Sequence, residues 1–150
     1  ASDVYKRQRM IWTGAARAPA AALFLAFDYG TRRIGVASGN SLTRSATPLA
    51  TVADAAADAR FAAIGRLISD WQPAALVVGV PRHPDGAPHD NTRRAERFAR
   101  QLQGRFGLPV HAVDERYTTT EAQALGASEA NVDAASAALI LEQYFNASAA

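Results

Sequence analysis

Two short apolar runs separated by a turn form the clearest pattern in the chain. Leu23–Asp28 is apolar up to its final carboxylate, and Arg33–Ser38 follows after a glycine-containing connection. Runs of this length predict β-strands, and the short connection predicts a hairpin. Ser45–Val52 predicts a third strand, in which Pro48 indicates an edge position because proline cannot donate to a neighbouring strand.

The periodicity then becomes helical. Asp54 is a suitable cap for a helix that continues through Asp70. Its apolar residues recur at helical spacing and predict the face that packs on a core; they are Phe61, Ile64, Leu67, Ile68 and Trp71. Ala75–Val78 is a short apolar run typical of a buried strand. Gly79–Asn91, rich in proline and glycine, predicts a loop.

The rest of the chain predicts further helices around one more strand. The next helix has Ala95, Phe98, Ala99 and Leu102 on its inward face. Pro109–Val113 predicts a strand that leads into Asp114 and Glu115. Thr118–Glu121 has the composition of a capping box. A last helix is expected from Val132 to Phe145, with Ala135, Leu139 and Tyr144 among its inward residues.

This order of elements predicts a single α/β domain. The opening hairpins are antiparallel, whereas the later strand–helix–strand units favour right-handed parallel crossovers. A mixed central sheet with helices on both faces follows. Ligands of such sheets gather beyond the carboxyl ends of the strands, where Asp28, the Gly79 loop and Glu115 are expected. We expect residues 1–22 to be a disordered lead, 23–146 to be the domain and 147–150 to be a tail.

The amino-acid composition limits the cellular compartments in which the protein is expected. The chain has 150 residues and no cysteine, so it has no disulfide framework and no thiolate metal site, which fits a cytoplasmic protein. No apolar run reaches the roughly 20 residues of a membrane-spanning helix. Ala18–Phe27 resembles the apolar part of an export signal, but it continues into Asp28 without a small-residue cleavage site.

The formal charge of +2 depends on the first residues. Ala1–Arg9 reads like the translation of a sequencing-library end, and we interpret it as an assembly scar that precedes a natural start at Met10. Without it the chain has thirteen basic and thirteen acidic residues. Net charge therefore gives little support for a nucleic-acid partner.

Three carboxylates are candidates for a shared site: Asp28 after the first strand, Glu115 after the last strand and Asp133 near the start of the last helix. Magnesium prefers carboxylate and water oxygens and takes one or two carboxylates per ion. Three carboxylates could hold a pair of ions about 4 Å apart, one activating water and the other stabilising the leaving oxygen.

Each carboxylate also has a purely structural explanation. Asp28 could pair with Arg32 or Arg33, and Glu115 could form a surface ion pair with Arg116. Asp133 could be a helix cap or a partner of the helix dipole. Asp114 is ambiguous, since neighbouring strand residues point to opposite faces of a sheet.

Basic residues give a second candidate surface. The helix after the proline-rich loop has arginines on its outer positions: Arg93, Arg94, Arg97 and Arg100. Such a face is either solvated or contacts phosphate, for which the guanidinium group is well suited. The three histidines have no convincing zinc spacing, and neither a Gly-x-Ser-x-Gly nucleophile motif nor a Walker-type phosphate loop occurs.

Four segments together resemble the YqgF/RuvX family of small bacterial nuclease-like proteins. They run in order from about Leu23 to Phe145, and they are Asp28–Ala37, Val78–Pro81 with Asp85–Gly86, Asp114–Thr119 with Glu121–Ala122, and Val132–Ala135 with Ile140–Leu141. The glycine turn alone is a weak signal, whereas the four segments together are specific.

The resemblance implies an RNase H-like fold, a mixed five-stranded sheet of order 3-2-1-4-5 with strand 2 antiparallel, flanked by helices. It implies that Asp28, Glu115 and Asp133 are the catalytic residues and hold Mg²⁺ or Mn²⁺. It also implies hydrolysis of phosphodiesters, in maturing the 5′ end of pre-16S rRNA or in cutting Holliday junctions. The expected nucleic-acid contacts are Arg32, Arg33, Arg93, Arg97, Arg100 and Arg116.

The sequence is also compatible with functions other than RNA cleavage. A junction resolvase would need a dimer with two sites, so the chain could be a monomer or a homodimer. A binding module could recognise nucleic acid or ribosome-assembly partners without cutting. The Asp28-x-Gly30-Thr31 pattern also occurs in sugar-kinase and actin-like ATPases, but these clamp nucleotide between two domains and this chain has length for one.

Overall fold

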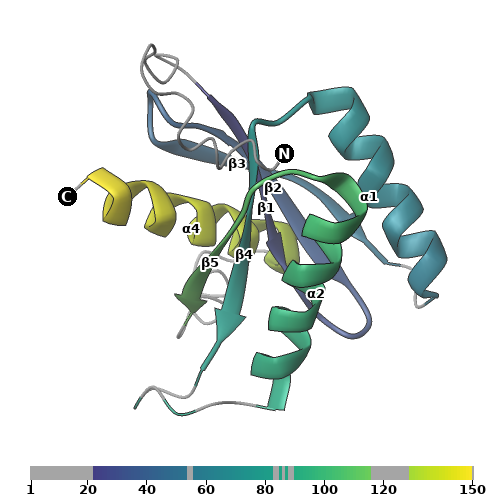
Figure 1. Cartoon of the computed structure of the whole chain (residues 1–150). Helices are drawn as coiled ribbons and strands as arrows, with labels where there is room; N and C mark the ends of the chain where they lie inside the picture. The colour runs from purple at the N-terminus through teal and green to yellow at the C-terminus, as the bar shows by residue number, and fades with distance from the viewer. Residues whose placement is uncertain are drawn as a thin grey trace.

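The computed structural model describes residues 22–53, 56–82, 85, 87, 90–115 and 129–149, and these form one mixed sheet with helices on both faces (Figure 1). The strands are β1 (Leu23–Asp28), β2 (Ile34–Asn40), β3 (Ser45–Val52), β4 (Ala75–Pro81) and β5 (Val110–Glu115). Their order across the sheet is β3-β2-β1-β4-β5. Strand β2 is antiparallel to β1 and β3, whereas β1, β4 and β5 are parallel. The expected sheet is confirmed.

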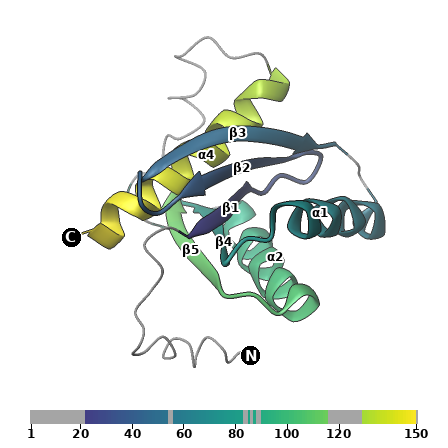
Figure 2. The ribbon, with the colours of Figure 1, turned by 90° about the horizontal axis from the view of Figure 1, so that it is seen from above.

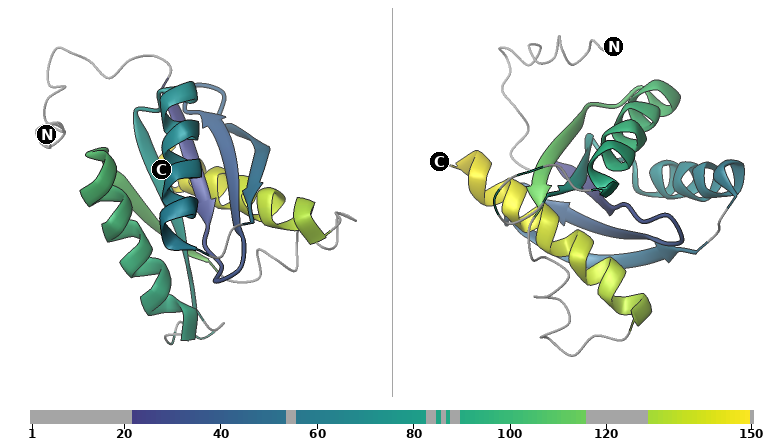
Figure 3. Two further views of the ribbon diagram at one scale, coloured as in Figure 1. Left: turned by 90° about the vertical axis from the view of Figure 1, so that its right-hand side faces the viewer. Right: turned by 90° about the horizontal axis from the view of Figure 1, so that it is seen from below.

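Within the described part of the chain, three helices cover the two faces of the sheet. They are α1 (Ala57–Trp71), α2 (Asp90–Phe106) and α4 (Glu129–Ala149). Helices α1 and α2 lie on one face of the sheet, and α4 crosses the other. The view from above (Figure 2) and the view from below (Figure 3, right) both show this arrangement. Among the described residues, no helix has the length and apolarity needed to cross a membrane.

The apolar run of β1 is continuous because both faces of this central strand are buried. Leu25 and Phe27 pack into the core beneath α1 and α2, whereas Ala26 packs beneath α4 against Ile140 and Leu141. Successive side chains of a strand point to opposite faces, so a strand between two helical layers needs apolar residues at every position. The next two residues continue the alternation: Asp28 faces α4, and Tyr29 packs with the other core.

Several boundaries differ from the expected ones. Strand β4 continues to Pro81, so Gly79 belongs to the strand rather than to a loop. Helix α1 begins after Ala56, which makes no side-chain capping bond. Asp54 and the Thr118–Glu121 capping box lie outside the described residues. Trp71, at the end of α1, is among the exposed large apolar residues rather than inward.

The inward face of α4 also differs from the prediction. Ala137, Ile140 and Leu141 are fully buried, whereas Ala135 and Leu139 are only partly buried. Apolar residues and small alanines occur on nearly all sides of this helix, so periodicity alone could not select the face that packs.

Candidate active site

Asp28 ends β1 between two glycines. It pairs with Gly35 of β2 on one side and with Gly79 of β4 on the other. A Cβ at Gly35 would overlap the backbone carbonyl oxygen of Asp133, and a Cβ at Gly79 would overlap the side chain of Ile140. The two glycines therefore allow α4 to lie directly on the strands beside Asp28.

Glu115 approaches Asp28 from the β4 side. It is the last residue of β5 and is only 7% exposed. Its Oε2 atom would lie 3.1 Å from a Cβ placed on Gly79, the residue that pairs with Asp28. The Glu115 side chain is therefore buried at the end of the sheet, and Arg116, its possible ion-pair partner, lies outside the described residues.

Asp133 approaches from the β2 side. It lies in the second turn of α4, which begins at Glu129, so it is not the cap of that helix. Its Oδ2 atom accepts a hydrogen bond from Arg33 Nε at 2.5 Å. Arg33 therefore pairs with Asp133. The alternative pairing of Arg33 with Asp28, which the sequence left open, is not seen among the described residues.

Electrostatic repulsion links the three carboxylates. Burial is the largest cause that raises the pKa of Asp28 well above its usual value, and the charges of Glu115 and then Asp133 raise this pKa further. A half-buried carboxylate beside two others is destabilised in its charged form unless a cation lies nearby. No ion pair reaches Asp28 among the residues described. We call Asp28, Glu115 and Asp133 the acidic site.

The donor set of the acidic site can be tested against the chemistry of a divalent cation. Within the described ranges, no three of the His, Cys, Asp and Glu side chains form a group that could hold one metal ion. Glu115 and Asp133 lie on opposite sides of Asp28, so each can form a pair with it. Because magnesium takes one or two carboxylates per ion, two such pairs around a common Asp28 fit the chemistry of this donor set.

Asp114 does not belong to this site. It precedes Glu115 in β5 and therefore points to the opposite face of the sheet. Its side chain is 60% exposed, and its Oδ1 accepts a hydrogen bond from Arg82 Nε at 3.0 Å. The ambiguity of adjacent strand residues is resolved in favour of Glu115.

The predicted arginines are divided between two places. Arg32 is exposed in the loop after β1, beside Arg33. Three others are exposed on α2, in the layer across the sheet from α4: Arg93, Arg97 and Arg100. Arg116 lies outside the described residues.

Sequence reasoning missed residues on both faces. The close-approach roles of Gly35 and Gly79 depend on pairing with Asp28, which only the strand register reveals. Arg60 of α1 is buried, and its position one helical turn before Ile64 placed a charge on the apolar face of that helix. A charged residue on an otherwise apolar helix face was the sequence feature that could have identified Arg60 as a buried residue.

Comparisons with known proteins place the chain among close relatives. Residues 22–147 match the family model RuvX, described as "Holliday junction resolvase". A protein of Polaromonas sp. (strain JS666) named "Putative pre-16S rRNA nuclease" is 65% identical over 121 residues, covering 81% of this chain and 86% of that protein. A Burkholderia vietnamiensis (strain G4) protein with the same name is 55% identical over 134 residues, covering 83% and 89%.

The fold has a more distant structural neighbour. RuvC of T. thermophilus, solved in complex with a Holliday junction substrate, superimposes with a TM-score of 0.54 at 14% identity, over 85% of this chain and 96% of that one. At this identity the likeness concerns the fold alone, and it agrees with the RNase H-like architecture. The match of the family model over nearly the whole described domain, together with these relatives, shows that the chain belongs to the RuvX family.

Proposed function

We propose that this protein is a divalent-metal-dependent nuclease of the cytoplasm that hydrolyses phosphodiester bonds in structured RNA. The precursor of 16S rRNA, at its 5′ end, is the proposed substrate. The observation that carries this proposal is the convergence of Asp28, Glu115 and Asp133 at one end of the sheet, with the pKa of Asp28 raised by burial and by the other two. The names of the relatives support the choice of substrate.

The acidic site would hold Mg²⁺ or Mn²⁺ between its carboxylates, with Asp28 shared and Glu115 and Asp133 completing the two pairs. When bound, the cations supply Lewis-acid stabilisation of the charge that develops on the phosphate and on the leaving oxygen. Gly35 and Gly79 contribute by letting α4 and Glu115 approach Asp28. Arg33 orients the Asp133 carboxylate through its hydrogen bond.

The proposed nucleic-acid contacts come from two places, the loop after β1 and the outer face of α2. Arg32 and Arg33 lie in the loop that follows Asp28, and they would contact phosphates next to the cut. The exposed arginines of α2 lie in the other layer and would contact more distant parts of a folded RNA; they are Arg93, Arg97 and Arg100. Arg116 follows Glu115 and is proposed as a further contact from its sequence position.

Holliday junction cleavage is a second candidate, favoured by the description of the matched family. It would require two copies of the acidic site for two symmetric cuts, and hence a dimer. The Arg33–Asp133 ion pair favours a third candidate, a binding module, because a carboxylate held by its own guanidinium has less need of a metal ion.

A cleavage assay with two substrates distinguishes these functions. The whole chain would be incubated with labelled pre-16S RNA and with a four-way DNA junction, each with Mg²⁺, with Mn²⁺ and with a chelator. We expect cleavage of the RNA that requires the metal. Symmetric junction cleavage by a dimer, with intact RNA, would instead support the resolvase. Metal-independent binding without cleavage of either substrate would contradict catalysis.

A further inference from the structure

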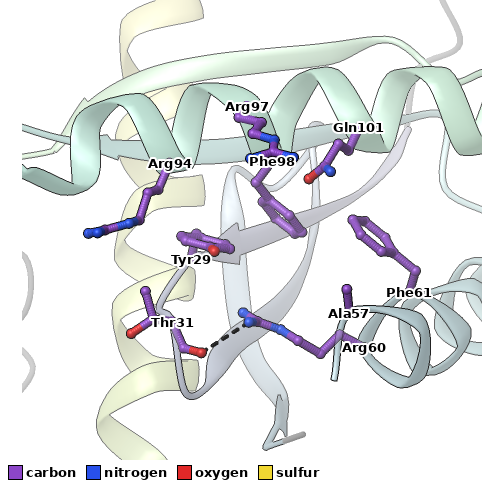
Figure 4. A pocket seen from close by; sticks show the side chains of 9 residues that line it. All are labelled: Tyr29, Thr31, Ala57, Arg60, Phe61, Arg94, Arg97, Phe98 and Gln101. Atoms are coloured by element: carbon purple, nitrogen blue, oxygen red, sulfur yellow. Dashed lines mark hydrogen bonds between the residues drawn. The ribbon is translucent and has the colours of Figure 1, made fainter. Parts of the chain in front are cut away.

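A pocket of about 300 Å³ lies on the face of the sheet away from the acidic site. It is enclosed by the loop after β1, by α1 and by α2 (Figure 4). Its volume is at the lower end of the range for small-molecule sites, about 300–1,000 Å³, so it suits a ligand of nucleotide size or smaller. It is lined by Tyr29, Thr31, Ala57, Arg60, Phe61, Arg94, Arg97, Phe98 and Gln101.

The lining is strongly cationic. Among the described residues that line the pocket, Arg60, Arg94 and Arg97 are basic and none is acidic. Three positively charged side chains that line one cavity lower the energy of an anion bound in it. Charge therefore selects an anionic ligand.

Arg60 is an unusual part of this wall because it is only 8% exposed. Its Nη1 donates to the backbone oxygen of Thr31 at 3.1 Å, its Nη2 donates to the backbone oxygen of Gly30, and its guanidinium lies 5.1 Å from the centre of the Tyr29 ring. No described carboxylate forms an ion pair with it. A buried cation that has only neutral acceptors is stabilised further by a nearby anion.

The remaining groups favour phosphate over a nucleobase. The Tyr29 ring already contacts Arg60 and the Phe98 ring, whose centre is 4.9 Å from that of Tyr29, so base stacking would have to displace these contacts. Arg94 and Arg97 extend from exposed positions of α2, where their guanidinium groups can form paired hydrogen bonds with phosphate oxygens.

We propose that this pocket binds the phosphate of a nucleotide, at a site distinct from the acidic site. Tyr29 directly follows Asp28, and the two side chains point to opposite faces of the sheet. A ligand in the pocket would therefore contact the loop that leaves the catalytic strand. The phosphate can belong to an RNA strand or to a free nucleotide. Separate binding measurements with RNA and with AMP distinguish these two sources.

Binding measurements with a double variant test this proposal without relying on cleavage. In the Asp28→Asn background, with a chelator present, Arg94→Ala/Arg97→Ala is compared with the parent for binding of a labelled short single-stranded RNA and of AMP. We expect the Kd of at least one ligand to rise about tenfold or more, since two charge-assisted contacts are lost. A rise for RNA alone identifies the polymer backbone as the ligand, and a rise for AMP identifies a free nucleotide.

The matched control removes two positive charges elsewhere. Arg66 of α1 and Arg44 of the turn after β2 are exposed and do not line the pocket. Arg44 has a left-handed backbone with φ of 56°, so Arg44→Asn/Arg66→Ala is used, because asparagine tolerates that conformation. The proposal is overturned if this control weakens binding as much as the pocket variant does, or if the pocket variant binds both ligands like the parent. Loss of cleavage in the preceding assay would leave this result unaffected.

Discussion

Asp28→Asn is expected to reduce metal-dependent cleavage of pre-16S RNA by at least about 10³-fold. Asp28 is the residue shared by both carboxylate pairs, so its neutralisation removes a ligand from each proposed cation. Metal ions contribute several kcal/mol to the stabilisation of transition-state charge. Because each 1.36 kcal/mol corresponds to a factor of ten in rate, losing this contribution gives the expected magnitude. Cleavage rates are measured under single-turnover conditions at saturating Mg²⁺ or Mn²⁺.

Asp114→Asn is the matched control for this experiment. It makes the same chemical change at the same end of the sheet, but the Asp114 side chain faces the opposite side and is largely exposed. Its cleavage rate should stay within a few fold of the parent. Glu115→Gln and Asp133→Asn should resemble Asp28→Asn. Parental cleavage by Asp28→Asn, or an equal loss in Asp114→Asn, would remove Asp28 from the catalytic role.

Gly35→Ala is expected to destabilise the protein by about 3 kcal/mol. The new Cβ would overlap the backbone carbonyl oxygen and carbon of Asp133, and backbone cannot move aside as the end of a flexible side chain can. Helix α4 would have to shift away from β2, which would also displace Asp133 from Asp28. Chemical denaturation measures the change in the free energy of unfolding.

Gly104→Ala provides the control for this substitution. Gly104 lies within α2, and a Cβ there would meet no atom within 4 Å outside its own helix backbone and chain neighbours. Alanine at an open helical position should stabilise by about 0.5–1 kcal/mol, because glycine loses more conformational freedom on folding. The two substitutions should therefore have opposite signs. If Gly35→Ala were as stable as the parent, the close packing of α4 on β2 would be wrong.

The fold was largely predictable because its strongest signals are local. The apolar run that ends at Asp28, the proline of the edge strand β3 and the helical spacing in α1 each follow from short-range chemistry. The position of the Asp28–Gly35 and Asp28–Gly79 pairs was not predictable in this way, because it depends on the register of strands distant in sequence.

The sequence indicated which residues belong to the candidate site, but it did not indicate which of them contact one another. Asp28 and Glu115 stood out because carboxylates at the ends of apolar strands are costly without a partner. The bond between Arg33 and Asp133 joins residues 100 positions apart and has no local signal. The arginine face of α2 was visible as a pattern, but only the packing of α1 beside α2 shows that Arg94 and Arg97 line a pocket with Arg60.

Whether the three carboxylates repel one another and share a cation is tested by the melting temperatures of the parent and of Asp28→Asn, measured against pH with and without Mn²⁺. The raised pKa of Asp28 means that its protonated form stabilises the fold below the ordinary value of 3.8, and that this contribution is lost as the pH rises through the raised value. Without metal at pH 7.5, Asp28→Asn should therefore melt higher, by roughly 3 °C or more, and the difference should close on acidification. Mn²⁺ should raise the melting temperature of the parent and leave that of Asp28→Asn nearly unchanged. Equal melting temperatures without metal, together with equal shifts on adding Mn²⁺, would show that these carboxylates neither repel one another nor share a cation.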